Sequence, residues 1–78
     1  MTPIEIEQLI STGLPGCSVA VNSDDNTHFE AVIVSPDFAG KRPLQRHQMV
    51  YKTLGDAMGG AIHALSIEAL TPEEQAAS

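Results

Sequence analysis

The chain has 78 residues, with ten acidic and four basic side chains and a formal net charge of −6. This length predicts one domain, residues 1–78, whose core buries only roughly 60% of the unfolded surface, so no deep substrate cavity is expected. The acidic balance opposes non-specific binding to nucleic acid and to anionic membranes. No apolar run approaches the ~20 residues of a membrane span, so a membrane partner is not expected.

Cysteine usage and the first residues indicate the compartment. Cys17 is the single cysteine, which excludes an internal disulfide and favours a reducing environment. The chain starts without the basic segment and apolar run of a signal peptide. We therefore expect a cytoplasmic protein, with Cys17 as a buried, unreactive thiol on the apolar face of a strand.

The first expected elements are a helix and a β-hairpin. Thr2 suits the N-cap, Pro3 the first helical position, Glu5 completes a capping box, and Gly13 suits the helix stop. Segments 17–21 and 28–34 alternate as strands around a polar turn at 23–26. The residues expected to share one face are Ile6, Leu9 and Ile10 on the helix, Cys17, Val19 and Val21 on the first strand, and Phe29, Ala31 and Ile33 on the second.

The second half of the chain predicts a single helical turn at 35–38, a helix over 44–58 ended by Gly59-Gly60, and a strand over 64–69. A second capping box at 71–74 predicts a short C-terminal helix. Val32 and Val34 make the strand over 28–34 apolar on both faces, so we expect it to be central. The residues expected to share one side are Leu44, His47, Val50, Tyr51, Leu54 and Met58 on the helix, and Leu65, Ile67 and Ala69 on the strand.

The expected order is α-β-β-α-β-α, which belongs to the α+β class. The helix between the second and third strands is long enough for a crossover, so those strands can be parallel. A three-stranded mixed sheet with helices on one face is the simplest architecture.

No catalytic motif is present: the sequence lacks a P-loop, G-x-G-x-x-G, G-x-S-x-G and H-E-x-x-H. The literal G-x-x-G at 13–16 lies between a helix and a strand and carries no charge, unlike the loop that RNA-binding KH domains use. We therefore expect no enzymatic activity of this chain alone.

Three histidines are candidates for chemistry. His28 opens the second strand and His63 precedes the third, so the two can meet at one end of the sheet, and imidazole is a good ligand for zinc or iron. Two histidines do not complete a metal site, and each can instead cap a strand or make a surface hydrogen bond. His47 falls on the apolar side of the long helix, where a half-buried, hydrogen-bonded role is expected.

All four cations of the chain, Lys41, Arg42, Arg46 and Lys52, lie in one twelve-residue segment. This segment is either an ordinary solvated helix face with weak charge pairs or a docking surface for an anionic partner or nucleic acid. Lys41, Arg42, Arg46 and His47 are the residues expected to dock a partner on the second interpretation.

Several segments in order resemble the BolA family: THF at 27–29 with VIVS at 32–35, FAGK at 38–41 with LQRHQMVY at 44–51, IHALSI at 62–67, and LTPEE at 70–74. The short hairpin turn and acidic composition are most similar to the small bacterial branch called IbaG. The resemblance implies a type II KH-like fold, α-β-β-α-β, without the RNA-binding loop.

The resemblance also implies a function. BolA proteins partner monothiol glutaredoxins, and the pair holds a [2Fe–2S] cluster with the glutaredoxin cysteine and glutathione; the isolated BolA protein holds no cofactor. The ligand from the BolA side is the histidine before the last strand, here His63, and His28 is the only candidate for a second one. Some members are described as DNA-binding transcriptional regulators, which is the alternative function expected.

Overall fold

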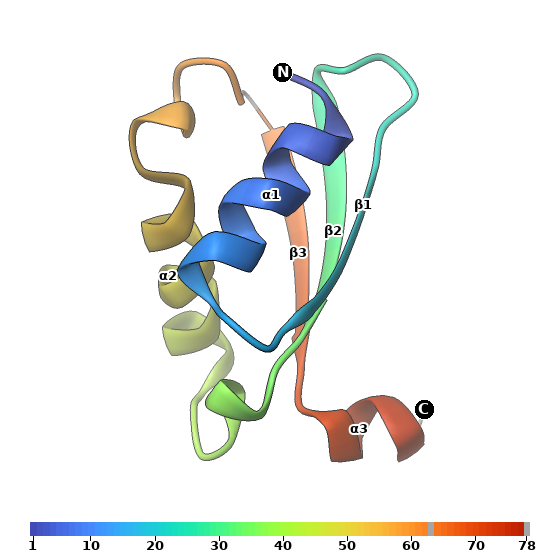
Figure 1. The fold of residues 1–78 in the computed structure, drawn as a ribbon, viewed down its shortest axis with the longest axis vertical. Coiled ribbons are helices and arrows are strands. Elements are labelled where there is room, and N and C mark those ends of the chain that lie inside the picture. The colour runs from blue at the N-terminus through green and yellow to red at the C-terminus, as the bar shows by residue number, and fades with distance from the viewer. Residues whose placement is uncertain (63, 78) are drawn as a thin grey trace.

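The computed structural model of the protein describes residues 1–62 and 64–77. Its α-helices are α1 (Pro3–Gly13), α2 (Pro43–Leu54) and α3 (Pro72–Ala77). Its strands are β1 (Ser18–Asn22), β2 (His28–Val34) and β3 (Ala64–Leu70). Two short 3-10 turns, η1 (Pro36–Phe38) and η2 (Gly55–Ala57), precede and follow α2. The elements follow the expected order (Figure 1).

The three strands form one mixed sheet in the order β1-β2-β3. β1 and β2 pair antiparallel as a hairpin, and β2 and β3 pair parallel across the α2 crossover. In the register His28 lies opposite Ala64 and Val34 opposite Leu70, so β2 and β3 start and end together. The predictions of a central second strand and of a parallel third strand are confirmed.

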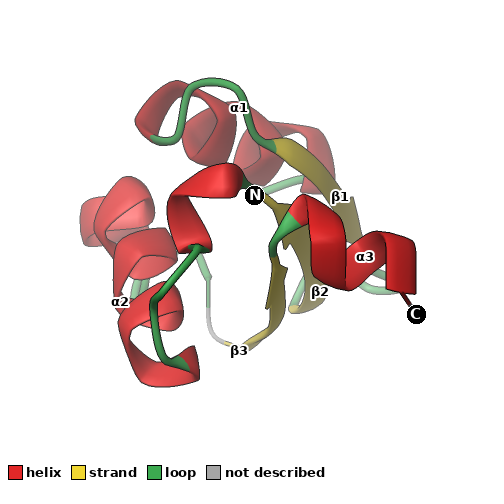
Figure 2. Cartoon of the chain, turned by 90° about the horizontal axis from the view of Figure 1, so that it is seen from below, coloured by secondary structure: helices red, strands yellow, loops and turns green. Residues whose placement is uncertain are grey.

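Helices α1 and α2 cover one face of the sheet, while α3 lies at the end where β3 finishes (Figures 1 and 2). The core lies between the sheet and these two helices because the alternate residues of each strand point toward them. The described residues at its centre are Ile6, Ile10, Leu14, Val21, Phe29, Ala31, Ile33, Phe38, Val50, Leu54 and Ile62. Cys17, Val19, Leu65, Ile67 and Ala69 pack against this centre, as predicted for the strand faces.

The start of α1 follows the prediction. The Thr2 hydroxyl accepts a hydrogen bond from the Glu5 N–H at 3.3 Å, and the Glu5 carboxylate accepts one from the Thr2 N–H at 2.9 Å. This capping box satisfies two donors that would otherwise lack partners in the first turn. Leu9, which the sequence pattern places on one face with Ile6 and Ile10, is 37% exposed, since Ile6 and Ile10 already fill the stripe that faces the sheet.

The predicted extent of the long helix is wrong at its end. α2 stops at Leu54 because Gly55 adopts a positive φ of 54°, which favours glycine, and η2 follows. Gly59-Gly60 therefore lies beyond the helix. Leu44 and Tyr51 are also not buried, with 69% and 40% exposure, because α2 turns only Val50 and Leu54 fully into the core.

Candidate functional site

The amino end of β2 carries the first predicted site residue. His28 is the first residue of the strand, and 74% of its side chain is exposed. It lies opposite Ala64, the first residue of β3 and the next residue after position 63 in the chain. His63 itself, the predicted principal ligand, lies outside the described residues, so its assignment stays a prediction from the sequence.

The turn before β2 is organised around Asp25. Its Oδ1 accepts hydrogen bonds from the backbone N–H groups of Thr27 and His28, both at 2.9 Å. Its Oδ2 lies 3.0 Å from Nδ1 of the His28 ring. Ser23 ties the turn from the other side: its hydroxyl donates to the His28 carbonyl at 2.6 Å and accepts from the Asn26 N–H at 2.9 Å. The His28 backbone and ring are therefore both held by the turn.

These contacts keep Asp25 charged. The hydrogen bonds from the His28 backbone, the His28 ring and the Thr27 backbone hold the pKa of the Asp25 carboxyl well below its usual range. A charged carboxylate can only accept a hydrogen bond, so its contact with Nδ1 requires that nitrogen to carry the proton, which in a neutral ring leaves the lone pair on Nε2. The same arrangement is common behind histidines that bind a metal through Nε2.

The described residues do not complete a metal site by themselves. No group of three His, Cys, Asp or Glu side chains suited to a metal ion occurs in residues 1–62 and 64–77. His28 offers one exposed imidazole with a carboxylate behind it, which fits a single ligand position of a shared centre. A [2Fe–2S] cluster, with four ligands, therefore requires donors from outside this part of the chain.

Arg46 is embedded in the structure. Its guanidinium donates to the carbonyls of Lys41 at 2.9 Å and Ala69 at 3.0 Å, and to Glu74 at 2.6 and 3.3 Å. It also lies 6.0 Å from the centre of the Phe38 ring. Only 12% of the side chain is exposed. Arg46 therefore joins the loop before α2 to the end of β3 and to α3, and little of its charge is left for a partner.

The other three cations are more accessible, and we call this set the α2 cationic face: Lys41 and Arg42, which lie just before α2, and Lys52 in its last turn. All three are exposed, and so are Leu44 and Tyr51 of the same helix. The sequence pattern places Leu44 and Tyr51 on the apolar side of the helix, so it does not predict that they are exposed. The face thus combines positive charge with exposed apolar side chains.

His47 is half-buried on α2, as predicted. No described residue forms the predicted hydrogen bond with its ring.

The two predicted site regions lie far apart. His28 opens β2, whereas Arg46 bonds Ala69 near the opposite end of the sheet. A seven-residue strand spans roughly 20 Å. The start of β2, which we call the histidine end because His28 lies there, and the start of α2 are therefore at opposite ends of the molecule (Figure 1). They therefore form two separate surfaces.

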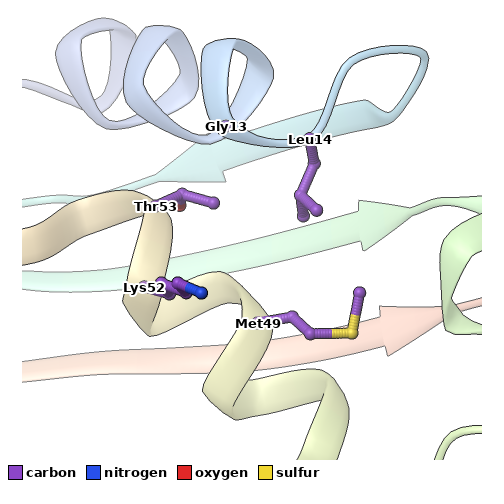
Figure 3. A pocket seen from close by; sticks show the side chains of 5 residues that line it. All are labelled: Gly13, Leu14, Met49, Lys52 and Thr53. Atoms are coloured by element: carbon purple, nitrogen blue, oxygen red, sulfur yellow. The ribbon is translucent and has the colours of Figure 1, made fainter.

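A shallow pocket of about 360 Å³ opens between the end of α1 and α2 (Figure 3). The side chains of Leu14 and Met49 point toward each other across it, with Lys52 and Thr53 beside them. Gly13, the first residue of the literal G-x-x-G, lines this pocket and packs against Thr53 of α2.

Cys17 is partly buried and forms no disulfide with any residue that the structure describes. Burial raises the pKa of its thiol, which lowers the fraction of reactive thiolate at neutral pH. The burial predicted for Cys17 is therefore only partial, and its lack of reactivity stays a prediction. Among the helices that the structure describes, none has the length and apolar character required to cross a membrane.

The fold and this site define a class: small α+β proteins with an antiparallel hairpin, a parallel third strand, and a histidine at the sheet end. The family model for "BolA-like protein" matches residues 14–74. The chain belongs to the BolA family. The prediction of this family and of its α+β fold is confirmed; the IbaG branch stays a prediction.

Individual relatives support the same family assignment. A bolA protein homologue from Coxiella burnetii has a TM-score of 0.88 and 43% identity, covering 97% of each chain. BolA-like protein 1 of Homo sapiens is 46% identical over 55 residues, which is 70% of this chain and 40% of that protein. The DNA-binding transcriptional regulator BolA of Haemophilus influenzae is 45% identical over 53 residues, 68% of this chain and 52% of that protein. The matches thus span about half or less of these curated relatives.

Proposed function

We propose that this protein is a cytoplasmic partner of a monothiol glutaredoxin, with which it holds a [2Fe–2S] cluster for trafficking or regulation. The family resemblance suggests the partner and the cluster. The observation that supports the proposal best is the register: His28 lies opposite Ala64, the residue that follows His63 in sequence. Two imidazole ligands from the histidine end, with a glutaredoxin cysteine and glutathione, make four.

Histidine ligands have a chemical consequence. Imidazole is neutral where thiolate is anionic, and histidine ligation raises the potential of a [2Fe–2S] centre. A ligand imidazole must also be unprotonated, so assembly is expected to weaken as the pH falls through the ~6.5 region where free histidine titrates. We propose no enzymatic role for the chain, since its contribution is to bind and orient.

The test is anaerobic reconstitution of the cluster with a monothiol glutaredoxin and glutathione, read by visible absorption and circular dichroism. His63→Ala is expected to abolish or change the heterodimer spectrum, and His28→Ala to change it less. Gln8→Ala, an exposed change on α1, is the control and should leave the spectrum as in the unmodified protein. An unchanged spectrum in His63→Ala shows that the principal ligand is wrongly assigned.

A second candidate function is DNA binding, favoured by the name of the Haemophilus influenzae relative and by the α2 cationic face. The net charge of −6 opposes it, and Arg46 is already engaged with Glu74. Duplex DNA titrations at several salt concentrations separate the two functions. Affinity that falls with salt and drops further in Lys41→Ala and Arg42→Ala supports DNA binding; absence of binding leaves the glutaredoxin partnership as the proposal.

A further inference from the structure

Asp25 is placed to decide which nitrogen of His28 is available. Its two carboxylate oxygens have different roles: Oδ1 accepts the Thr27 and His28 backbone N–H groups, and Oδ2 faces Nδ1 of the ring at 3.0 Å. The two backbone donors fix the rotation of the carboxylate. Because the charged carboxylate is an acceptor only, the neutral ring must place its proton on Nδ1 to complete the contact.

We propose that Asp25 is a positioning residue that holds the neutral His28 ring with its proton on Nδ1 and its lone pair on Nε2. Nε2, on the mostly exposed ring, is then the atom available to bind a metal from outside the chain. The ring is held against rotation by the hydrogen bond that Nδ1 donates to Asp25, in a turn that Ser23 itself stabilises. This inference deepens the proposed function, since it concerns the same histidine, but it is a statement about the free protein and can be tested there.

The substitution Asp25→Asn reverses the expected tautomer. The Asn oxygen must occupy the Oδ1 position, because an amide N–H₂ there would face two backbone donors. The amide nitrogen then takes the place of Oδ2 and donates to Nδ1 of His28. The proton of the neutral ring is consequently expected on Nε2, and the lone pair on Nδ1.

The measurement is the long-range ¹H–¹⁵N NMR spectrum of the His28 ring at about pH 9, well above the ~6.5 of free histidine. The unmodified protein should show Nδ1 protonated as the major form, and Asp25→Asn should show Nε2 protonated. Asp24→Asn is the matched control: it makes the same charge change one residue away, and no hydrogen bond joins Asp24 to the ring. Equal tautomer populations in the unmodified protein and Asp25→Asn overturn the proposal.

A second readout separates this inference from the proposed function. In the reconstituted heterodimer, Asp25→Asn should alter the cluster's circular dichroism in the same direction as His28→Ala, while Asp24→Asn should not. If the tautomer reverses but neither Asp25→Asn nor His28→Ala changes the cluster, the positioning of the ring is supported and the role of His28 as a ligand is overturned.

Discussion

The Arg46 guanidinium contacts three separate segments: the loop carbonyl of Lys41, the Ala69 carbonyl at the end of β3, and the Glu74 carboxylate of α3. From the sequence, Arg46 is only one of four neighbouring cations. Its role depends on which groups the fold brings within reach, and these lie up to 28 positions away in the chain. Single-residue chemistry of this kind is decided by tertiary contacts.

Replacing Arg46 by Ala is expected to lower the free energy of unfolding by about 2 kcal/mol, because the part-buried Ala69 carbonyl loses a charged donor. Urea unfolding followed by circular dichroism measures this. Arg42→Ala, an exposed change four positions earlier, should stay within about 0.5 kcal/mol. Equal losses in the two variants would argue against a structural role of the Arg46 hydrogen bonds.

At the level of elements, α1 and α2 pack closely where Gly13 meets Thr53. A Cβ at Gly13 would lie 2.5 Å from Thr53 Cγ2 and 2.7 Å from Thr53 Cβ. Glycine at this position therefore serves the packing of two helices as well as the helix end that the sequence indicates. The sequence alone does not tell these two uses of glycine apart.

Gly13→Ala is expected to destabilise the protein by about 1–2 kcal/mol, since overpacking costs more than the gain in helix propensity. Chemical denaturation measures it, with Thr12→Ala on the exposed side of α1 as the control. The double variant with Thr53→Ser, which removes Cγ2 and keeps the hydroxyl, should recover part of the loss. A stabilising Gly13→Ala would contradict the close contact.

For the whole molecule, hydrogen bonds to three carboxylates contribute to its acid sensitivity. Hydrogen bonds from Thr2 lower the pKa of Glu5, and those from the His28 backbone and ring lower the pKa of Asp25. Hydrogen bonds from Arg46 and Thr71 lower the pKa of Glu74 from 4.5 to about 2. A carboxyl with a lowered folded-state pKa binds protons less readily when folded. Stability therefore falls as the unfolded chain takes up more protons in acid.

The Glu74 contribution is fully present above pH 4.5 and is lost as the pH falls toward about 2. Glu74→Gln, which removes the charge and keeps the shape, is expected to lower stability at neutral pH and to flatten the acid branch of the stability curve. Thermal midpoints from pH 7 to about 2 measure both. Glu73→Gln is the control on the same helix turn, and an equally steep acid branch in Glu74→Gln would contradict the contact.

Local sequence signals determined most of the fold. Capping residues and alternation predicted the start of α1, both strands of the hairpin and the start of α3, because these depend on neighbours a few positions apart. The tertiary structure decided what depends on distant partners, namely that Leu9, Leu44 and Tyr51 are exposed. The end of α2 at Leu54 is instead a local effect of Gly55, which the sequence pattern does not distinguish from Gly59-Gly60 as the helix stop. The tertiary structure also decided that Arg46 bonds Ala69 and Glu74, and that His28 and the start of α2 lie at opposite ends of the molecule. A period in the sequence defines a helix face, but only packing against the sheet selects which part of it is buried.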